Sequence, residues 1–480
     1  MPFDLAASAR NEMLSRGFHP DFPPQTAELI AATRSHPPSL ANGVRDLRDL
    51  LWSSIDNATS RDLDQIEVAE RTADGIRVLI GIADVDAAVP IGSPLDQHAR
   101  SEATTVYTPV KTFPMLPLEL STDLTSLNEA ADRLALVIEM LIANDGAVTK
   151  SDVSRALVRN HAQLTYESTG PWIERSAPPP KIAANLDLQA QLQLQDEAAR
   201  ALRDERHRRG ALVFDRAEAN PIVANGKVTG IAAQPDNRAS NLIEQFMIAA
   251  NEAIANWLLA RGIPALQRVV SSPERWPRIV DLAAQHGATL PAQPDPVALS
   301  TFLRDQQAKD PARYPDLSLA VIKLLGPGSY EVVKPGHAGS GHFALASHDY
   351  THSTAPNRRF ADLATQRLLK AALLNRPSPY PDDDLNSIAQ NCTAREDAAR
   401  KVARAMNKRA VALAYHDRIG QTFDAVVTGV KPNATFVRVL NPPIEGMLAR
   451  GSRGLDVGDR LRVALVSTDV ERGYVDFARL

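Results

Sequence analysis

Three carboxylates within nine residues are the sharpest chemical feature of this sequence. Asp56, Asp62 and Asp64, followed at once by Gln65, alternate with small polar residues that favour turns. Hard divalent cations prefer oxygen ligands, and Mg²⁺ typically takes one or two carboxylates together with water and substrate phosphate. Two such metals can stabilise both the attacking and the leaving oxygen of a phosphodiester. The segment is therefore a candidate metal site, although an acidic surface turn that caps a helix or strand is the commoner origin of such a loop.

A second polar segment, Tyr350–Leu363, carries the adjacent arginines Arg358 and Arg359 just before an expected helix at Asp362–Leu374. Paired arginines before a helix can hold a phosphate through bidentate hydrogen bonds. Pairing of these side chains with surface acids is the ordinary alternative, and the sequence leaves both interpretations open.

Four histidines in or near this second segment raise the question of a zinc site. Only one pair has the i, i+4 spacing of ligands on a helix, and no cysteine lies nearby, so hydrogen-bonded or exposed histidines are the favoured interpretation. The four are His337, His342, His348 and His352.

One aromatic residue also merits attention, because aromatic residues make up only 5% of the chain. Tyr107 lies in the short extended run Thr104–Pro109, and an aromatic ring beside a metal site can stack on a nucleobase. A tyrosine packed in the core would give the same pattern.

The bulk composition fits a globular protein of two to four domains. The net charge of −4 argues against a protein that coats nucleic acid non-specifically, yet Lys and Arg outnumber Asp and Glu by six from Arg358 to the end. The single cysteine, Cys392, fits a reducing compartment. With neither a secretory signal nor a bilayer-spanning run in view, we expect a cytoplasmic, monomeric protein that does not bind membranes.

The elements that must position these residues follow from hydrophobic periodicity. Ile76–Ile82 is typical of a buried strand, whereas Leu134–Ile142 fits a strand or a helix. The proline-rich runs Ser168–Pro180 and Arg376–Asp384 predict loops or breaks. Helices are expected at Leu5–Arg16, Thr26–Arg34, Leu188–Arg209, Asn241–Ala260 and Ala394–Arg418.

The last sixty residues change character and favour a small closed barrel. Five short β-like runs are separated by turns, which is the number of strands that an OB fold requires. The runs are Phe423–Val430, Ala434–Leu440, Gly446–Leu448, Arg460–Ser467 and Gly473–Phe477.

Five motifs in a fixed order resemble the catalytic (RNB) domain of the ribonuclease II family. The tail Gly420–Leu480 is similar to an OB fold of the S-one type, with Phe436 where such domains carry an aromatic that faces RNA. The five motifs lie in Ile55–Gln65, Ile82–Val85, Pro114–Leu127, Leu242–Met247 and His342–Leu363.

The resemblance implies an α+β catalytic domain with a channel for a single RNA strand, followed by a five-stranded barrel. It implies processive hydrolysis from the 3′ end to nucleoside 5′-monophosphates, with Mg²⁺ as the metal and Mn²⁺ as its alternative. The domains would be a small helical region at 1–45, the RNB domain at 46–418 and the S-one-type domain at 419–480.

The resemblance also assigns roles to residues. Asp62, Asp64 and Arg358 would be catalytic, with Arg358 at the scissile phosphate. The metal would be held by Asp56, Asp62, Asp64 and Gln65, and RNA would be contacted by Tyr107, Arg359 and Phe436.

Several departures from the family pattern matter. Gln65 replaces a fourth aspartate, so we expect weaker metal binding unless a nearby acid compensates. Ala355, Asn357 and Phe360 replace the usual Ser, Ile and Tyr but spare the guanidinium of Arg358.

The front of the chain departs most, because residues 1–45 are too few for the two cold-shock domains that relatives usually carry. We therefore expect better tolerance of short duplexes. A catalytically weak RNA-binding clamp with the same fold is the alternative function, and a nuclease that acts on DNA or internally is a third.

Overall fold

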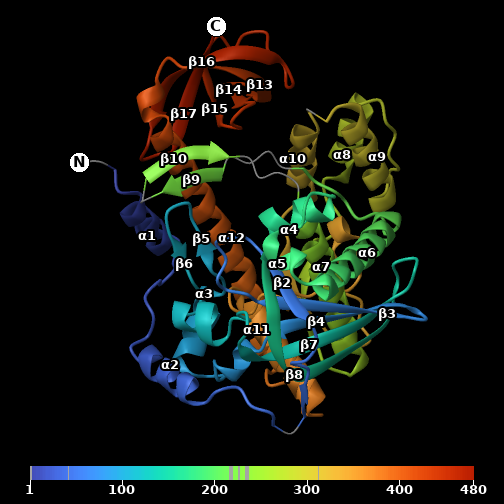
Figure 1. Cartoon of the computed structure of the whole chain (residues 1–480). Coiled ribbons are helices and arrows are strands. Elements are labelled where there is room, and N and C mark those ends of the chain that lie inside the picture. The colour runs from blue at the N-terminus through green and yellow to red at the C-terminus, as the bar shows by residue number, and fades with distance from the viewer. Residues whose placement is uncertain (1–2, 42, 216–219, 225–226, 233–236, 312) are drawn as a thin grey trace.

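The structure is a computed structural model that describes residues 3–41, 43–215, 220–224, 227–232, 237–311 and 313–480. Figure 1 shows a strand-rich body surrounded by helices, with a separate small barrel that holds the C-terminus. Within the described part of the chain, no helix combines the length and the apolar character that a membrane span needs.

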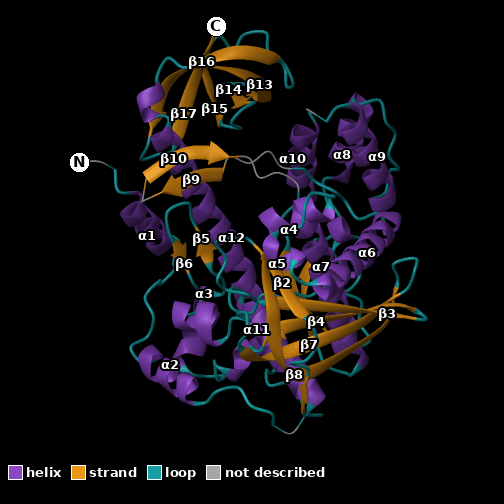
Figure 2. Ribbon diagram, in the orientation of Figure 1, coloured by secondary structure: helices purple, strands orange, loops and turns teal. Residues whose placement is uncertain are grey.

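A six-stranded sheet forms the centre of the body (Figure 2). The long strand β8 pairs with β7 from Val148 to Arg159 and with β2 from Asn160 to Thr165, so the sheet curls back on itself. The strands are β1 (Val44–Asp46), β2 (Trp52–Asp56), β3 (Gln65–Thr72), β4 (Gly75–Ala83), β7 (Asp132–Ile142) and β8 (Val148–Thr165). The strand expected at Ile76–Ile82 is confirmed, and Leu134–Ile142 is a strand because it pairs on both edges, with β4 and β8.

Four long helices complete the body: three contact strands of this sheet, one of them buried on nearly all sides, and the fourth joins the same hydrophobic core through its first turns. They are α6 (Leu186–Arg209), α7 (Arg238–Ala260), α11 (Phe360–Leu373) and α12 (Asp382–Ala414). The apolar face expected for α7 is buried in the main core. The side-chain amide of Gln191 on α6 accepts from the backbone N–H of Ala69 and donates to its carbonyl. These two hydrogen bonds satisfy backbone groups of β3 past the point where β3 pairs with β2.

The N-terminal region contains the two expected helices, α1 (Leu5–Ser15) and α2 (Thr26–Ser35). The buried face of α1 packs with residues of α12, so this region is attached to the body. The shorter elements are α3 (Pro94–Glu102), β5 (Val106–Tyr107), β6 (Thr112–Phe113), α5 (Pro180–Ala183), β9 (Asn220–Ala224), β10 (Lys227–Ala232), β11 (Ala265–Val269), α8 (Trp276–Gln285), α9 (Pro296–Lys309), α10 (Tyr314–Leu325) and β12 (Ser329–Val333).

Two expectations from proline content are wrong in part. The loop expected at Ser168–Pro180 is helical up to Ile173, as α4 (Tyr166–Ile173). The Thr165 side chain caps this helix by accepting from Ser168 N, and Gly170 packs so closely against Asn237 that a methyl group would not fit.

The break expected up to Asp384 ends earlier. Helix α12 begins at Asp382, directly after Pro381, because three aspartates in its first turn suit the positive end of the helix dipole.

The C-terminal barrel has the five strands expected, and it is closed. They are β13 (Thr422–Lys431), β14 (Ala434–Val439), β15 (Glu445–Arg450), β16 (Arg460–Asp469) and β17 (Tyr474–Arg479). Arg438 on β14 donates hydrogen bonds to both carboxylate oxygens of Asp316 on α10, and this ion pair attaches the barrel to the body.

Candidate active site

The aspartate segment is the loop that joins β2 to β3, at one end of the central sheet. Asp56 ends β2 and closes the loop, because its Oδ1 accepts from the Asn57 N–H and the Ser60 hydroxyl, both at 2.7 Å. Farther along, the Ser126 hydroxyl accepts from Leu63 N at 2.9 Å and donates to the carbonyl of Arg61 at 2.8 Å. The loop that presents Asp62 and Asp64 is thus held at both ends.

Asp64 is the most enclosed of the three carboxylates, with 3% of its surface exposed. Its Oδ1 accepts from the backbone N–H of Asn357 at 3.2 Å and from the Asn357 side-chain amide at 2.9 Å. Burial raises the pKa of Asp64 to about 7, the positive charge of Arg358 lowers it, and the negative charge of Asp62 raises it further. Asp64 therefore lies within electrostatic reach of both residues.

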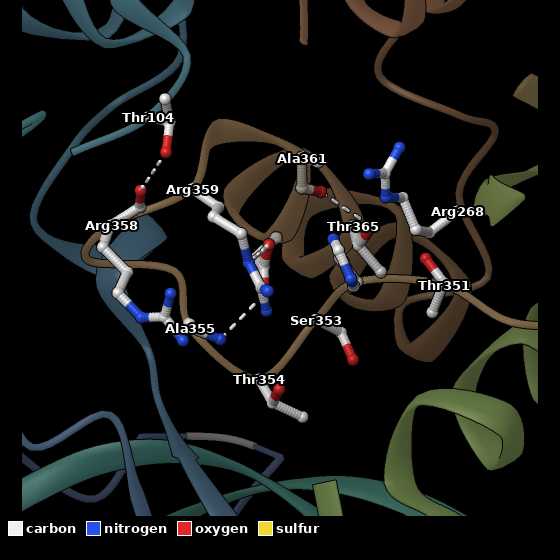
Figure 3. A network of polar contacts seen from close by, with 12 residues as sticks. Thr104, Arg268, Thr351, Ser353, Thr354, Ala355, Arg358, Arg359, Ala361 and Thr365 are labelled. Carbon is white, nitrogen blue, oxygen red and sulfur yellow. Dashed lines mark hydrogen bonds and ion pairs between the residues drawn. The ribbon is translucent and has the colours of Figure 1, made fainter. Parts of the chain in front are cut away.

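Arg358 is positioned through its backbone rather than through its guanidinium. Its carbonyl accepts from Thr105 N at 2.9 Å and from the Thr104 hydroxyl at 3.3 Å. Figure 3 shows the Thr104 bond, with the guanidinium extending away from it. Among the described residues that guanidinium forms no ion pair. The guanidinium of Arg358 is therefore available to bind an anionic substrate.

Asp62 and Tyr107 lie next to one another on the open side of this group. The Tyr107 hydroxyl donates to Asp62 Oδ2 at 3.5 Å, and Tyr107 is 48% exposed, so it is not the core residue that the sequence allowed. Burial, and then the charge of Asp56, raise the pKa of Asp62, while Arg358 lowers it. Two acids, one arginine and one aromatic ring therefore converge from three separate segments.

Arg359 has a different environment from Arg358. Its Nε and one terminal nitrogen each donate to the fully buried Asp362 at 2.8 Å. Asp362 Oδ1 also accepts from Ala355 N, so this pair fixes the loop before α11. The sequence left open a pairing of these arginines with surface acids, whereas Arg359 pairs with a buried one. Its contact with RNA stays a prediction.

Two predicted site residues remain, the metal ligand Gln65 and the RNA contact Phe436. Gln65 is the first residue of β3 and is largely buried, beside the aspartate loop. Phe436 lies on β14 of the barrel, with the Lys431 ammonium 5.4 Å from the centre of its ring, and so belongs to a different surface.

Three residues of this region, Asn357, Thr125 and Tyr166, were given no role from the sequence. Asn357 bridges Asp64 and Thr125, whose hydroxyl donates to Asn357 Oδ1 at 2.7 Å. Tyr166, at the start of α4, lies close enough to Asp56 and Glu67 for their charges to add to burial in raising its pKa. Only the departure from the family motif at 357 could have drawn attention to any of them.

The donor chemistry of the loop fits a hard divalent cation. Asp56 raises the pKa of Asp62, and Asp62 raises that of Asp64, so the acids repel one another and a cation would relieve that repulsion. Within the residues that the structure describes, no three His, Cys, Asp or Glu side chains are arranged as a ready metal cage. Mg²⁺ tolerates this, because it commonly uses one or two carboxylates and completes its shell with water and phosphate.

The histidine segment offers no zinc site in the described part of the chain. His352 Nδ1 is 2.6 Å from the Tyr330 hydroxyl, and His342 Nδ1 accepts from Leu345 N at 3.2 Å. Both are hydrogen-bonded histidines, as the favoured interpretation had it.

Comparison with known proteins places this geometry in context. Residues 44–375 match the family model of the RNB domain, and residues 421–480 match that of the RNase II-type exonuclease C-terminal S1 domain. Ribonuclease R of Thermotoga maritima is 30% identical over an alignment that covers 91% of this chain and 64% of that protein. The chain spans 59–64% of the length of three curated ribonuclease R relatives.

Solved structures share the fold. Mycoplasma genitalium RNase R, in complex with ribose-methylated single-stranded RNA, superposes with a TM-score of 0.88 at 22% identity, covering 99% of this chain and 78% of that one. Yeast Ssd1, described as a pseudonuclease, gives 0.74 at 17% identity, covering 92% and 55%. The α+β body with its C-terminal barrel, expected from the motifs, is thereby confirmed.

Proposed function

This chain belongs to the RNB-domain exoribonucleases of the ribonuclease II and R family, and from that membership we propose that it hydrolyses single-stranded RNA from the 3′ end. The proposed products are nucleoside 5′-monophosphates, the metal is Mg²⁺, and degradation is processive. The single observation that supports this most is the position of Arg358, whose charge acts on Asp62 and Asp64 while its guanidinium stays unpaired among the described residues.

Each residue has a proposed task. Arg358 contacts the scissile phosphate and stabilises the negative charge that develops on it. Tyr107 stacks on the base near the 3′ end and fixes the register of the strand, since its ring is half exposed beside Asp62. Asp64, buried and oriented by Asn357, accepts a proton or orients the attacking water.

The metal has a proposed place and a proposed task. Asp56, Asp62 and Asp64, with Gln65 as a neutral fourth group, would hold Mg²⁺. When bound, Mg²⁺ neutralises phosphate charge and activates water.

The wider expectations also become proposals. A channel that admits one strand would select single-stranded over double-stranded nucleic acid. Contacts to the 2′-hydroxyl would select RNA over DNA. Phe436 and Arg359 would contribute RNA contacts outside the acid cluster.

The test is a gel time course on an unstructured RNA labelled at its 5′ end, with Mg²⁺ and with EDTA, beside a DNA of the same sequence. Metal-dependent shortening of the RNA to a ladder or a short end product, with the DNA intact, supports the proposal. A single internal cut, or equal degradation of DNA, contradicts it.

A catalytically weak RNA-binding clamp is the second candidate, and Gln65 is the observation that favours it, because a neutral amide binds Mg²⁺ more weakly than a carboxylate. RNA that stays intact with Mg²⁺ while its mobility shifts would select this function. Gln65→Asp would then be the first variant to assay.

A further inference from the structure

Asp362 is a fully buried carboxylate whose side-chain hydrogen bonds, within the described residues, all come from the turn that carries Arg358. Its Oδ1 accepts from the backbone N–H of Ala355 and from one terminal nitrogen of Arg359, each at 2.8 Å, and its Oδ2 accepts from Arg359 Nε. The carbonyl of Ala355 in turn accepts from the backbone N–H groups of Arg358 and Arg359, at 3.2 and 3.0 Å. In Figure 3, both arginines extend from this one turn, residues 355–359. Asp362 thus binds the turn at its beginning and at its end.

These bonds differ from those of a helix cap. A capping side chain accepts from the free N–H groups of the first turn of its own helix, and acids there suit the helix dipole. Asp362 lies in the first turn of α11, yet its backbone donor is Ala355, which is seven residues earlier and outside the helix. The carboxylate therefore fixes the turn before the helix rather than the helix itself.

The end of the turn is also held by a second segment. Thr105 N donates to the carbonyl of Arg358 at 2.9 Å. Phe360 N, directly after the turn, donates to the carbonyl of Ala103 at 2.8 Å. The backbone of Arg358 is thus fixed from two sides, and one of the two depends on Asp362.

We propose that Asp362 is a positioning residue for Arg358. Through its bonds to Ala355 and Arg359, it sets where the Arg358 guanidinium meets the scissile phosphate. This role rests on the proposed function, because Arg358 is the residue that would contact that phosphate. A contact of Arg359 with RNA is compatible with it, since the second terminal nitrogen of Arg359 takes part in neither bond to Asp362.

A purely structural ion pair is the competing explanation. Arg359 and Asp362 have side chains that are 16% and 0% exposed, and removing one partner of a buried pair destabilises a fold wherever the pair lies. A comparable pair on the same helix provides the control. Asp96 Oδ1 on α3 lies 2.7 Å from Arg367 Nη1 on α11, and these side chains are 7% and 3% exposed. In the described chain, neither of these two side chains bonds to the turn at residues 355–359.

The experiment compares Asp362→Asn with Asp96→Asn in the full chain, by single-turnover cleavage of 5′-labelled RNA with Mg²⁺ and by RNA binding in EDTA. The amide at position 362 keeps an oxygen that can accept from Ala355 but leaves Arg359 without its anion. We expect the cleavage rate to fall about 10²-fold in Asp362→Asn, because a shift of about 1 Å in a reacting group costs that much. RNA affinity in Asp362→Asn, and the cleavage rate in Asp96→Asn, should stay within about twofold of the wild type.

A double-mutant cycle with Arg358→Ala separates positioning from general damage to the fold. If Asp362 acts through Arg358, the loss caused by Asp362→Asn should be at least about tenfold smaller in the Arg358→Ala background. Damage that is independent of Arg358 would slow cleavage by the same factor in both backgrounds, and that result overturns the proposal.

Circular dichroism establishes that each variant is folded. Asp362→Glu keeps the charge of the pair and moves the carboxylate by one methylene, so it serves in the same cycle if Asp362→Asn does not fold. A wild-type cleavage rate in the folded variant refutes the role of Asp362 alone. A wild-type chain that leaves RNA intact refutes the proposed function, and with it this role.

Discussion

The substitution Asp64→Asn tests whether Asp64 is needed for catalysis without disturbing the fold or RNA binding. The amide keeps the size of the side chain and an oxygen that can accept from Asn357, so the fold and RNA binding should persist. The variant loses a group that can accept a proton, and we expect kcat to fall by on the order of 10³-fold. The assay is single-turnover cleavage of 5′-labelled RNA, with binding measured by fluorescence anisotropy.

The same substitution has a calculable effect on stability in EDTA. Asp64 has a pKa of about 7 in the folded protein against an ordinary value of 3.8, a difference that corresponds to roughly 4 kcal/mol. Because the folded pKa is the higher one, this stability is fully present below the unfolded pKa and is lost as pH rises through about 7. The amide that replaces the carboxyl in the variant does not titrate, so the variant lacks this pH dependence.

The free energy of unfolding of Asp64→Asn, minus that of the wild type, should therefore grow by roughly 3 kcal/mol between about pH 5 and about pH 8. Urea denaturation at the two pH values measures it. A difference that does not change with pH would refute the reasoning about burial. Cleavage at the parent rate would refute the site assignment itself.

Three further outcomes are expected. Arg358→Lys should lower kcat by roughly 10²–10³-fold with little change in RNA affinity, because lysine lacks the planar fork; an unchanged single-turnover rate would contradict a role at the phosphate. Tyr107→Ala, made in the Asp64→Asn background, should weaken single-stranded RNA binding by about 1–3 kcal/mol in anisotropy titrations, and equal affinity would exclude stacking. Asn357→Ala removes a donor that lowers the pKa of Asp64, so the acidic limb of the pH–rate profile should move to higher pH, and a profile identical to the wild type would contradict that role.

Local regularity decided how much of the fold could be predicted from the sequence. The amphipathic pattern of α7 and the alternation within the barrel strands report directly on one buried face, so those elements were predicted well. Helix α4 was missed because Pro171 usually breaks helices, while the Thr165 cap and the close packing of Gly170 favour the helix here.

The site was predictable only where its motifs are contiguous. Asp62 and Asp64 lie in one loop, and the motif resemblance singled out Arg358. The bond between Asn357 and Asp64 joins positions 293 residues apart, which no local pattern encodes.

Helix α12 connects the catalytic body to the C-terminal barrel, so a movement of the helix in the body would also move the barrel. It has 33 residues and is therefore about 50 Å long at 1.5 Å per residue. One end contacts α11, which follows Arg358 in the chain, and the other end contacts β16 and β17. A rigid rod of that length acts as a lever, so a tilt of about 5° near α11 would displace its far end by about 4 Å. The Arg438–Asp316 pair anchors the barrel at a second point, so that such a tilt strains this ion pair and is resisted by it.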